Sequence, residues 1–258
     1  MGDDADGVPA TSDRPDPTCR DDELKPPKLF LTERVHVPVT DQVGYWHQRD
    51  SLSLDVPDHE SLDEWAGDRE RFLTFHVNVD DPTVHDALED VRAVLDEHDC
   101  TTVAPPEYYH ITVKQVGFPS DSPDRESDIT SEMARDIRQR AREAIADVEP
   151  FEVELPRLNL FPRVVFCEVQ EADPLRRLHA ALCDLPGMPA WEYEREEYTP
   201  HITLGHFRSA EGFDELVTEL EQVRERDRSP LRIDTLKLVD VPPAGLYPEF
   251  RTVEAFEL

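Results

Sequence analysis

The hydrophobic positions after residue 70 follow two alternating periods, one typical of strands and one typical of helices. The run at 72–79 predicts a strand, and Asp81-Pro82 then suits a helix N-cap with proline at the first helical position. Apolar residues at helical spacing follow at Val84, Leu88, Val91 and Leu95. A strand at 109–113, a helix over 133–148 and a strand at 151–155 complete this half of the pattern.

The same order of elements recurs from residue 163. A strand at 163–169 precedes Asp173-Pro174, and helical spacing over 175–185 leads to a strand at 200–204. A helix over 213–223 and closing strands near 231–239 and 250–256 follow. Pro82 lies 28 residues before His110 and Pro174 lies 27 before His201, so the register indicates a duplication.

This pattern predicts an α+β fold with two pseudo-symmetric lobes of antiparallel-rich sheets, outer helices and a central cleft. We expect one domain over 71–258, with lobes at about 71–160 and 161–258 between which strands can exchange. The two halves of a site would then come from one chain, so a monomer with no obligate protein partner is expected.

Two short segments are nearly identical, and each is the second strand of its half. They are His110-Ile111-Thr112-Val113 and His201-Ile202-Thr203-Leu204. Because alternate side chains of a strand share a face, each His and Thr point one way while the apolar pair enters the core. The duplication predicts that the two HxTx strands face each other across the cleft. His206 falls on the opposite face from His201 if the strand is regular, so it is interpreted as structural.

Paired imidazoles and hydroxyls suit phosphoester chemistry. Breaking a P–O bond requires one group that accepts a proton and one that donates a proton, and imidazole does either near neutral pH. Threonine hydroxyls can donate hydrogen bonds to phosphoryl oxygens, so no metal is needed. A single histidine on a strand is usually structural, but the repeated motif favours His110 and His201 as catalytic residues, with Thr112 and Thr203 binding the phosphate.

The charge is extreme, since 27 Lys and Arg against 58 Asp and Glu give a net charge of −31. Molar salt shortens the Debye length to about 3 Å and screens such repulsion, so we interpret the composition as halophilic adaptation. Phosphate contacts that rely on a broad basic groove weaken steeply with salt. Any nucleic acid should therefore be bound at one phosphate in a pocket.

Features missing from the rest of the sequence exclude several classes of protein. No apolar run approaches the roughly 20 residues of a membrane helix, and the N-terminus lacks a secretory signal, so a cytoplasmic protein is expected. The chain has neither a zinc motif such as HExxH nor a glycine-rich phosphate loop, so no metal or cofactor is predicted. Residues 1–27 form an acidic, Pro-rich segment predicted to be disordered, and 28–70 an accessory segment that either caps a lobe or regulates access to the cleft.

The paired motifs resemble the signature of the two-histidine phosphoesterase superfamily. The stretches His110–Gly117 and Tyr198–Leu204, and Leu160–Val165 before the second repeat, extend the resemblance over about 72–258. The nearest branch is the 2′-5′ RNA ligases, also described as RNA 2′,3′-cyclic phosphodiesterases. The resemblance implies a metal-independent enzyme in which one histidine activates water, or a ribose hydroxyl for ligation, and the other protonates the departing oxygen. The resemblance leaves open which histidine accepts the proton and which one donates it.

Three further residues are candidates for substrate binding. Lys114 shares a face with His110 and Thr112 in a regular strand and would attract a phosphate, although a solvated lysine at a strand end is the alternative. Tyr198 would stack on a base, or belongs to the core, and Arg163 would contact the phosphate. The expected partner is an RNA terminus or a small cyclic nucleotide. The alternative function is a module that binds such an end without turnover.

Overall fold

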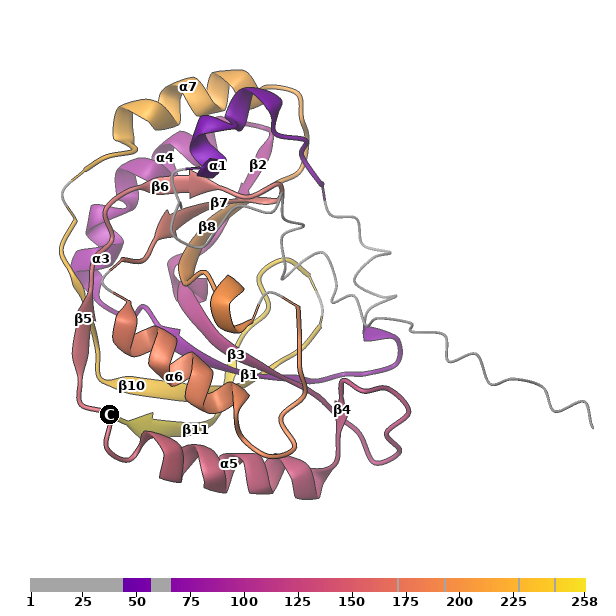
Figure 1. The fold of residues 1–258 in the computed structure, drawn as a ribbon. Helices are drawn as coiled ribbons and strands as arrows, with labels where there is room; N and C mark the ends of the chain where they lie inside the picture. The colour runs from indigo at the N-terminus through magenta and orange to yellow at the C-terminus, as the bar shows by residue number, and fades with distance from the viewer. Residues whose placement is uncertain (1–43, 57–65, 171, 193, 227, 244) are drawn as a thin grey trace, which may run out of the picture.

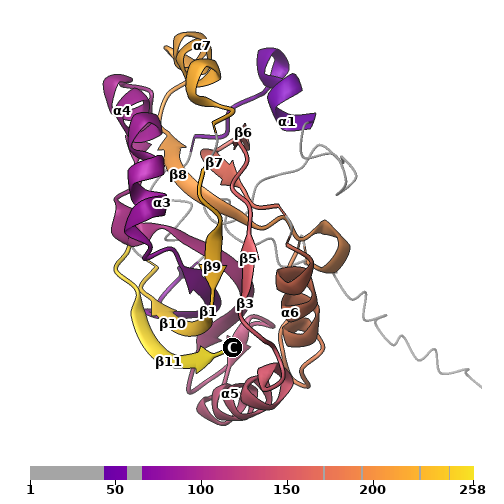
Figure 2. The same ribbon diagram turned by 90° about the vertical axis from the view of Figure 1, so that its left-hand side faces the viewer.

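Two antiparallel sheets meet along one strand of each, and helices cover their outer sides (Figures 1 and 2). The computed structural model describes residues 44–56, 66–170, 172–192, 194–226, 228–243 and 245–258. The predicted disordered tail and part of the accessory segment fall outside these residues. Strands and helices alternate in the predicted order, which agrees with the α+β class.

The first sheet has five strands in the order β11-β10-β1-β3-β4. All its pairs are antiparallel except β3–β4. It draws on both halves of the sequence, because the last two strands of the chain pair beside the first. Its strands are β1 (Phe72–Asn78), β3 (His110–Pro119), β4 (Asp128–Ile129), β10 (Thr235–Val241) and β11 (Arg251–Glu257).

The second sheet has four antiparallel strands in the order β2-β8-β7-β6. It also mixes the halves, since β2 precedes the first HxTx strand and pairs with the second. Its strands are β2 (Thr101–Val103), β6 (Leu158–Leu160), β7 (Val164–Glu168) and β8 (His201–Phe207). A separate pair, β5 (Phe151–Val153) and β9 (Leu231–Ile233), connects the lobes (Figure 2).

The helices are amphipathic and lie on two sides of the molecule (Figure 1). On one side α4 (Glu89–Glu97) packs against β2 and α7 (Phe213–Val223), and on the other α6 (Asp173–Cys183) packs against β3 and α5 (Ser131–Ile145). The predicted N-cap is confirmed, because the Asp81 carboxylate accepts the Thr83 N–H at 2.8 Å. The single helix expected there is instead two, α3 (Pro82–Ala87) and α4, which divide at Leu88.

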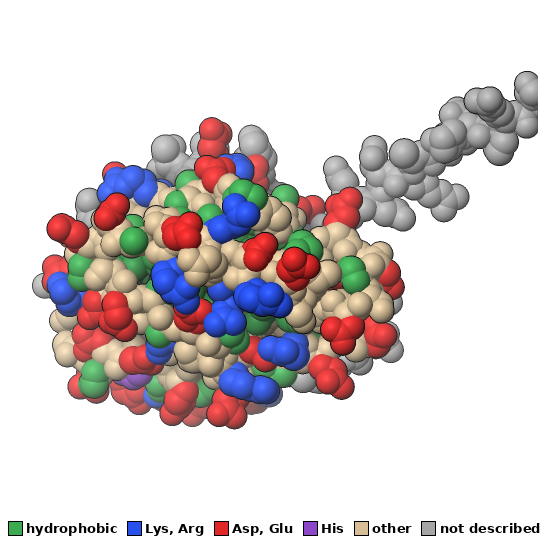
Figure 3. Space-filling model, turned by 90° about the horizontal axis from the view of Figure 1, so that it is seen from below, with side chains coloured by type: hydrophobic (Ala, Val, Ile, Leu, Met, Phe, Trp, Pro, Cys, Tyr) green, Lys and Arg blue, Asp and Glu red, His purple; other side chains and the backbone are tan. Residues whose placement is uncertain are grey.

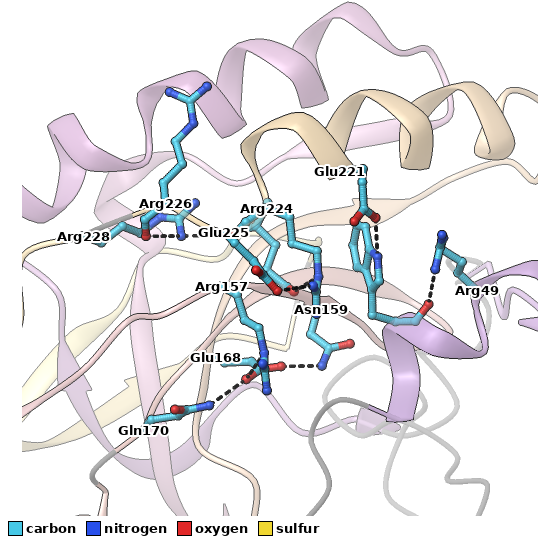
Figure 4. Close-up of polar contacts among 12 residues, drawn as sticks. Arg49, Arg157, Asn159, Glu168, Gln170, Glu221, Arg224, Glu225, Arg226 and Arg228 are labelled. Carbon is cyan, nitrogen blue, oxygen red and sulfur yellow. Dashed lines mark hydrogen bonds and ion pairs between the residues drawn. The ribbon is translucent and has the colours of Figure 1, made fainter.

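The described part of the accessory segment is docked on the second lobe. It forms α1 (Gly44–His47) and the 3-10 turn η1 (Arg49–Ser51), and α1 lies against β6. Trp46 is 1% exposed, its indole N–H donates to Glu221 on α7 at 2.6 Å, and Arg49 donates to its carbonyl at 3.1 Å (Figure 4). The guanidinium of Arg224 lies 4.8 Å from the indole ring. Trp46 therefore belongs to the hydrophobic core and anchors the segment.

A buried carboxylate joins β6 and β7 close to the second HxTx strand. Glu168 is fully buried and pairs with His201 in the sheet register. It accepts hydrogen bonds from Arg157 at 3.0 Å and Asn159 at 2.6 Å, and another from Gln170 at 3.2 Å (Figure 4). Because a buried charge is tolerated only when it is paired and hydrogen-bonded, this network fixes the strand beside His201.

The surface mixes both signs of charge. Seen from below Figure 1, basic side chains lie among carboxylates on this face (Figure 3). On α5, Arg138 and Arg142 are paired with Glu254 on β11. Among the helices that the structure describes, none has the length and apolar character needed to cross a membrane.

Candidate active site

The two HxTx strands carry the same irregularity at the same place. In the β1–β3 ladder His76 pairs with Thr112 and Phe75 with Lys114, which leaves Val113 as an extra residue. In the β7–β8 ladder Phe166 pairs with Thr203 and Val165 with Gly205, which leaves Leu204 as an extra residue. Each strand thus has a β-bulge directly after its threonine, and a bulge changes which side chains share a face.

The bulges correct two expectations based on regular strands. On β8, His206 pairs with Val164 and so shares the face of His201 and Thr203, where it lines the same cavity. The interpretation of His206 as a residue of the opposite face was therefore wrong. On β3, the register places Gln115, and not Lys114, on the face of His110 and Thr112. Gln115 and His206 occupy equivalent positions in the two repeats.

His110 and His201 present the same ring nitrogen to the cavity. The Nδ1 of His110 lies 2.6 Å from the Tyr108 carbonyl, and the Nδ1 of His201 lies 2.8 Å from the Thr199 carbonyl. Because a carbonyl only accepts, each Nδ1 carries the proton. In the neutral ring Nε2 is then the basic atom, and both rings line one cavity of about 110 Å³.

Aromatic side chains hold both imidazoles. His110 packs against Phe250 and Tyr108, with ring centroids at 4.8 and 5.0 Å, and also against His76 at 5.0 Å. These apolar surroundings remove water from the ring. The pKa of His110 is lowered to about 4, mainly by burial and also by the charge of His201, whereas the bond to the Tyr108 carbonyl opposes the shift. His110 is therefore a neutral base near pH 7.

His201 has a similar environment from the second lobe. Its ring centroid lies 5.2 Å from that of Phe161 and 5.3 Å from that of Phe166, and both contacts are edge-on. The two phenyl rings stack on each other at 4.1 Å, which fixes the wall behind His201. Each histidine thus packs against aromatic side chains of its own lobe, and both imidazoles line the cavity.

Thr112 and Thr203 lie between the histidines and the bulges. Both are half-buried and both line the cavity. In the described part of the chain no hydrogen bond to either hydroxyl is found, so each can donate to a ligand. The structure therefore brings the four residues of the paired motif to one cavity.

Lys114 borders the cavity, but its ammonium is fully engaged. It is 2% exposed and donates to the Gln115 carbonyl at 2.9 Å, to the Pro189 carbonyl at 2.7 Å and to the Glu194 carboxylate. An ammonium has three protons, so none remains for a phosphate. Burial lowers the pKa of Lys114, and the neighbouring Glu194 charge opposes this. These contacts argue against the phosphate-binding role and give Lys114 a structural one, holding the 189–194 loop on β3.

Arg163 lines the cavity and is 2% exposed. Its Nε and Nη2 both donate to one carboxylate oxygen of Asp55, at 3.0 and 2.7 Å. Nη1 is buried and has no partner among the described residues. The predicted phosphate ligand is thus a fixed cation with one unused donor, and its anchor comes from the accessory segment.

Tyr198 lines the cavity as a bridge between the lobes. Its hydroxyl donates to the Thr112 carbonyl at 2.9 Å, and its ring stacks on His179 with a centroid distance of 4.0 Å and an interplanar angle of 8°. Because His179 covers one face and the hydroxyl is used, only the other ring face can meet a base. The bond to the Thr112 carbonyl positions the strand that carries that threonine.

His179 is a buried residue that connects β3 to η3, and no sequence motif indicates this role. Its Nδ1 lies 2.6 Å from the carbonyl of the bulge residue Val113, and its Nε2 accepts the Arg195 N–H at 2.8 Å. Arg195 has a left-handed backbone, with φ of 59°. Burial lowers the pKa of His179 to about 4, so it stays neutral. Only its place on the apolar face of α6 could have indicated burial.

His206 is a third imidazole of the site. Tyr247 donates its proton to the Thr102 carbonyl, so its oxygen accepts from His206 Nδ1 at 3.0 Å. Nε2 is then the unprotonated nitrogen, as in the two motif histidines. Burial lowers the pKa of His206 to about 4, assisted by the charge of Arg163. The glycine before it, Gly205, is the signal that could have indicated a bulge.

The opposite wall of the cavity is acidic and aromatic. It is formed by the loop before η3 (Arg195–Glu197) and by that turn itself, and its residues include Trp191, Glu192, Glu194 and Glu197. Among the described residues, no group of three or more His, Cys, Asp or Glu side chains is arranged to hold a metal ion.

Comparisons with known proteins agree with this geometry. The family model described as "2'-5' RNA ligase superfamily" matches residues 82–241. No curated protein is similar enough in sequence to count as a match.

Several solved structures share the fold. TT0787 of Thermus thermophilus is 20% identical, with a TM-score of 0.54, and the match covers 72% of this chain and 97% of that one. E. coli LigT complexed with 3′-AMP is 14% identical, with a TM-score of 0.52, over 74% and 98% of the two chains. The LigT complex with NADP+ is 13% identical, with a TM-score of 0.54, over 73% and 98%.

The family match covers the helix that precedes the first HxTx strand, both HxTx strands and β10. The predicted two-lobed α+β fold is confirmed by the solved structures. Membership in this group supports an activity of the phosphodiesterase type. The chain belongs to the 2′-5′ RNA ligase superfamily of two-histidine phosphoesterases.

Proposed function

We propose that this protein hydrolyses 2′,3′-cyclic phosphates at RNA ends or on small cyclic nucleotides and leaves a 2′-phosphate. The observation that carries the proposal is the arrangement of His110 and His201, which each turn Nδ1 to a backbone carbonyl and line one cavity with the hydroxyls of Thr112 and Thr203. Because the two imidazoles and the two hydroxyls line one cavity, the arrangement suits a ligand that is held at a single phosphate. The solved LigT complex with 3′-AMP supports a ligand of this kind.

The reaction divides between the two imidazoles. His110, neutral near pH 7, accepts a proton from water through Nε2 while the water oxygen bonds to phosphorus. The P–O3′ bond breaks, the phosphate stays on O2′, and protonated His201 delivers its Nε2 proton to O3′. Each ring ends in the opposite protonation state, and proton exchange with solvent restores both. Ligation would follow the same route with a ribose 5′-hydroxyl in place of water: the 5′-oxygen bonds to phosphorus, the P–O3′ bond breaks, and a 2′-5′ phosphodiester forms.

The threonines stabilise charge in this scheme. During attack, negative charge grows on the two non-bridging oxygens of the phosphoryl group. Thr112 and Thr203 come from equivalent positions on β3 and β8, so each can donate to one of these oxygens. Fixed neutral donors in a partly dehydrated cavity need little reorganisation when charge develops.

The test uses an oligonucleotide with a 2′,3′-cyclic phosphate end, in molar KCl with EDTA. We expect the wild-type chain to form a 2′-phosphate. His110→Gln and His201→Gln should each lower kcat by about 10²–10⁴-fold, the usual contribution of a positioned acid or base. The double variant should be no more than slightly slower than either single one, because the two groups act as a unit. His47→Gln, which removes an exposed imidazole on α1, is the matched control.

Three outcomes would contradict the proposal. Binding of the RNA end without product would indicate the non-catalytic module. Activity that survives in both histidine variants would show that the imidazoles do not carry the reaction. A strict requirement for added divalent metal would exclude the scheme in which the two imidazoles suffice.

A further inference from the structure

The cavity has two cationic side chains among its described lining residues, and they differ in how many of their donors are hydrogen-bonded to the protein. Lys114 donates all three protons to protein oxygens, one of them on Glu194. Arg163 gives Nε and Nη2 to Asp55 and keeps Nη1 without a partner among the described residues. A buried donor left without an acceptor is unfavourable, so Nη1 of this cavity-lining residue would gain from an acceptor on a bound anion.

The position of Arg163 also suits a phosphate bound by the paired motif. Arg163 directly precedes Val164, the β7 residue that pairs with His206 on the cavity face of β8. Its backbone carbonyl accepts the Phe207 N–H at 2.8 Å, which ties it to the strand that carries His201 and Thr203. The backbone of Arg163 is therefore tied to the strand that carries the second HxTx motif, and its side chain lines the same cavity as that motif.

The orientation of Arg163 depends on the accessory segment. The Asp55 carboxylate receives two donors of the guanidinium, and the Asp55 N–H donates to the Pro162 carbonyl at 2.9 Å. The other end of the segment is fixed by Trp46, whose indole is buried against β6 and bonded to Glu221 (Figure 4). The segment is thus attached at both ends to the second lobe, with Asp55 at the end near the cavity.

This contact lies outside the part of the chain that matches the family model, which begins at residue 82. We propose that Asp55, near the end of the segment 44–56, is part of the active site and positions Arg163 so that Nη1 binds the substrate phosphate. The inference rests on the proposed function for the identity of the substrate. Asp55 is a positioning residue, because it acts through Arg163.

The experiment measures phosphate binding separately from turnover. Inorganic phosphate and adenosine 2′-phosphate are titrated calorimetrically into the full-length chain in molar KCl. The variants are Asp55→Ala, Arg163→Gln and their double, with Asp55→Asn as a second variant of the same size if the alanine variant does not fold. Glu221→Ala is the matched control, because it removes the carboxylate that holds the other end of the segment, away from the cavity.

We expect Arg163→Gln to weaken binding of both ligands by about 10- to 100-fold, the range for loss of a charge-assisted hydrogen bond. Asp55→Ala should weaken binding by about 10-fold, since the cation remains but is no longer held. The double variant should match Arg163→Gln alone, and Asp55→Ala should raise KM more than it lowers kcat. Glu221→Ala should lower thermal stability and leave phosphate binding unchanged.

Two results would overturn the inference. One is a folded Asp55→Ala or Asp55→Asn chain that binds both ligands as tightly as the wild type. The other is full additivity of the Asp55 and Arg163 effects, because a residue that acts through another contributes nothing once that other is gone. If the wild type turned over no cyclic phosphate while the binding losses appeared, the proposed function would fail and the role of Asp55 would stand.

Discussion

Mild acid should unfold this protein through its buried imidazoles. His179 and His206 are 2% and 4% exposed, and burial lowers the pKa of each to about 4. Protonation of His179 would place a new N–H on Nε2 against the Arg195 N–H that it now accepts. Protonation of His206 would add a positive charge near Arg163. Protonation is thus opposed in both rings, in His179 by loss of the hydrogen bond to the Arg195 N–H and in His206 by burial and the charge of Arg163.

The magnitude follows from linkage. In the unfolded chain an imidazole titrates at about 6.5, so between pH 6.5 and 4 the unfolded state binds a proton that the native state does not. Stability therefore falls as the pH falls through this window. A pKa difference of about 2.5 corresponds to about 3.4 kcal/mol, so His179 and His206 together remove about 7 kcal/mol by pH 4. This is a large share of the roughly 5–15 kcal/mol typical of a folded domain.

The assay is urea unfolding followed by circular dichroism in molar KCl, at pH steps from about 7.5 to 4.5. His179→Asn keeps a side-chain donor for the Val113 carbonyl and removes the titrating ring. Its free energy of unfolding should be lower at pH 7 but should fall less steeply, by about 1.4 kcal/mol per pH unit. His47→Gln, an exposed substitution, should leave the slope unchanged. An unchanged slope in His179→Asn would refute the assignment of His179 as a buried neutral ring.

Three further predictions concern the hydrogen bond of Tyr198, the backbone of Gly117 and the net charge of the protein. Tyr198→Phe removes the hydrogen bond to the Thr112 carbonyl and should lower the unfolding free energy by about 1–2 kcal/mol and raise KM; wild-type values for both would contradict the bridging role. Gly117→Ala should cost about 3 kcal/mol or more in urea unfolding, because φ is +141° and a Cβ would lie 2.3 Å from the Ser127 carbonyl oxygen; a neutral effect would argue against this backbone. The Tm should rise with KCl concentration, since the net charge is −31, and a Tm independent of salt would exclude charge repulsion as a limit on stability.

The hydrophobic periods predicted the longer strands and helices of both halves, but not the short strands β2, β4 and β6. The N-cap at Asp81 and the runs that became β1, β7 and β10 were visible because each rests on local rules of capping and alternation. The motif residues His110 and His201 were also visible, because a repeated pattern in equivalent places is a signal that no single histidine has. The solved relatives confirm the fold that these patterns predict.

The rest of the site was not visible because it depends on backbone irregularity and on distant contacts. One extra residue, Leu204, moves His206 to the cavity face, and alternation alone assigns it to the other. On β3 the extra residue Val113 likewise places Gln115, and not Lys114, on the face of His110 and Thr112. The contact of Asp55 with Arg163 joins residues 108 positions apart, and nothing in the local sequence of either one indicates the other.

The exchange of strands between the two halves has a consequence for synthesis of the protein. β1 pairs with β10, so Phe72 lies opposite Val241, 169 residues later. Before two such distant strands can pair, the chain must close a large loop. The entropy cost of this closure slows folding. The sheet that contains the strand with His110 cannot be completed until β10 and β11 have left the ribosome. We therefore expect a nascent chain that lacks β10 and β11 to have no active site, and the protein to acquire activity only as a whole.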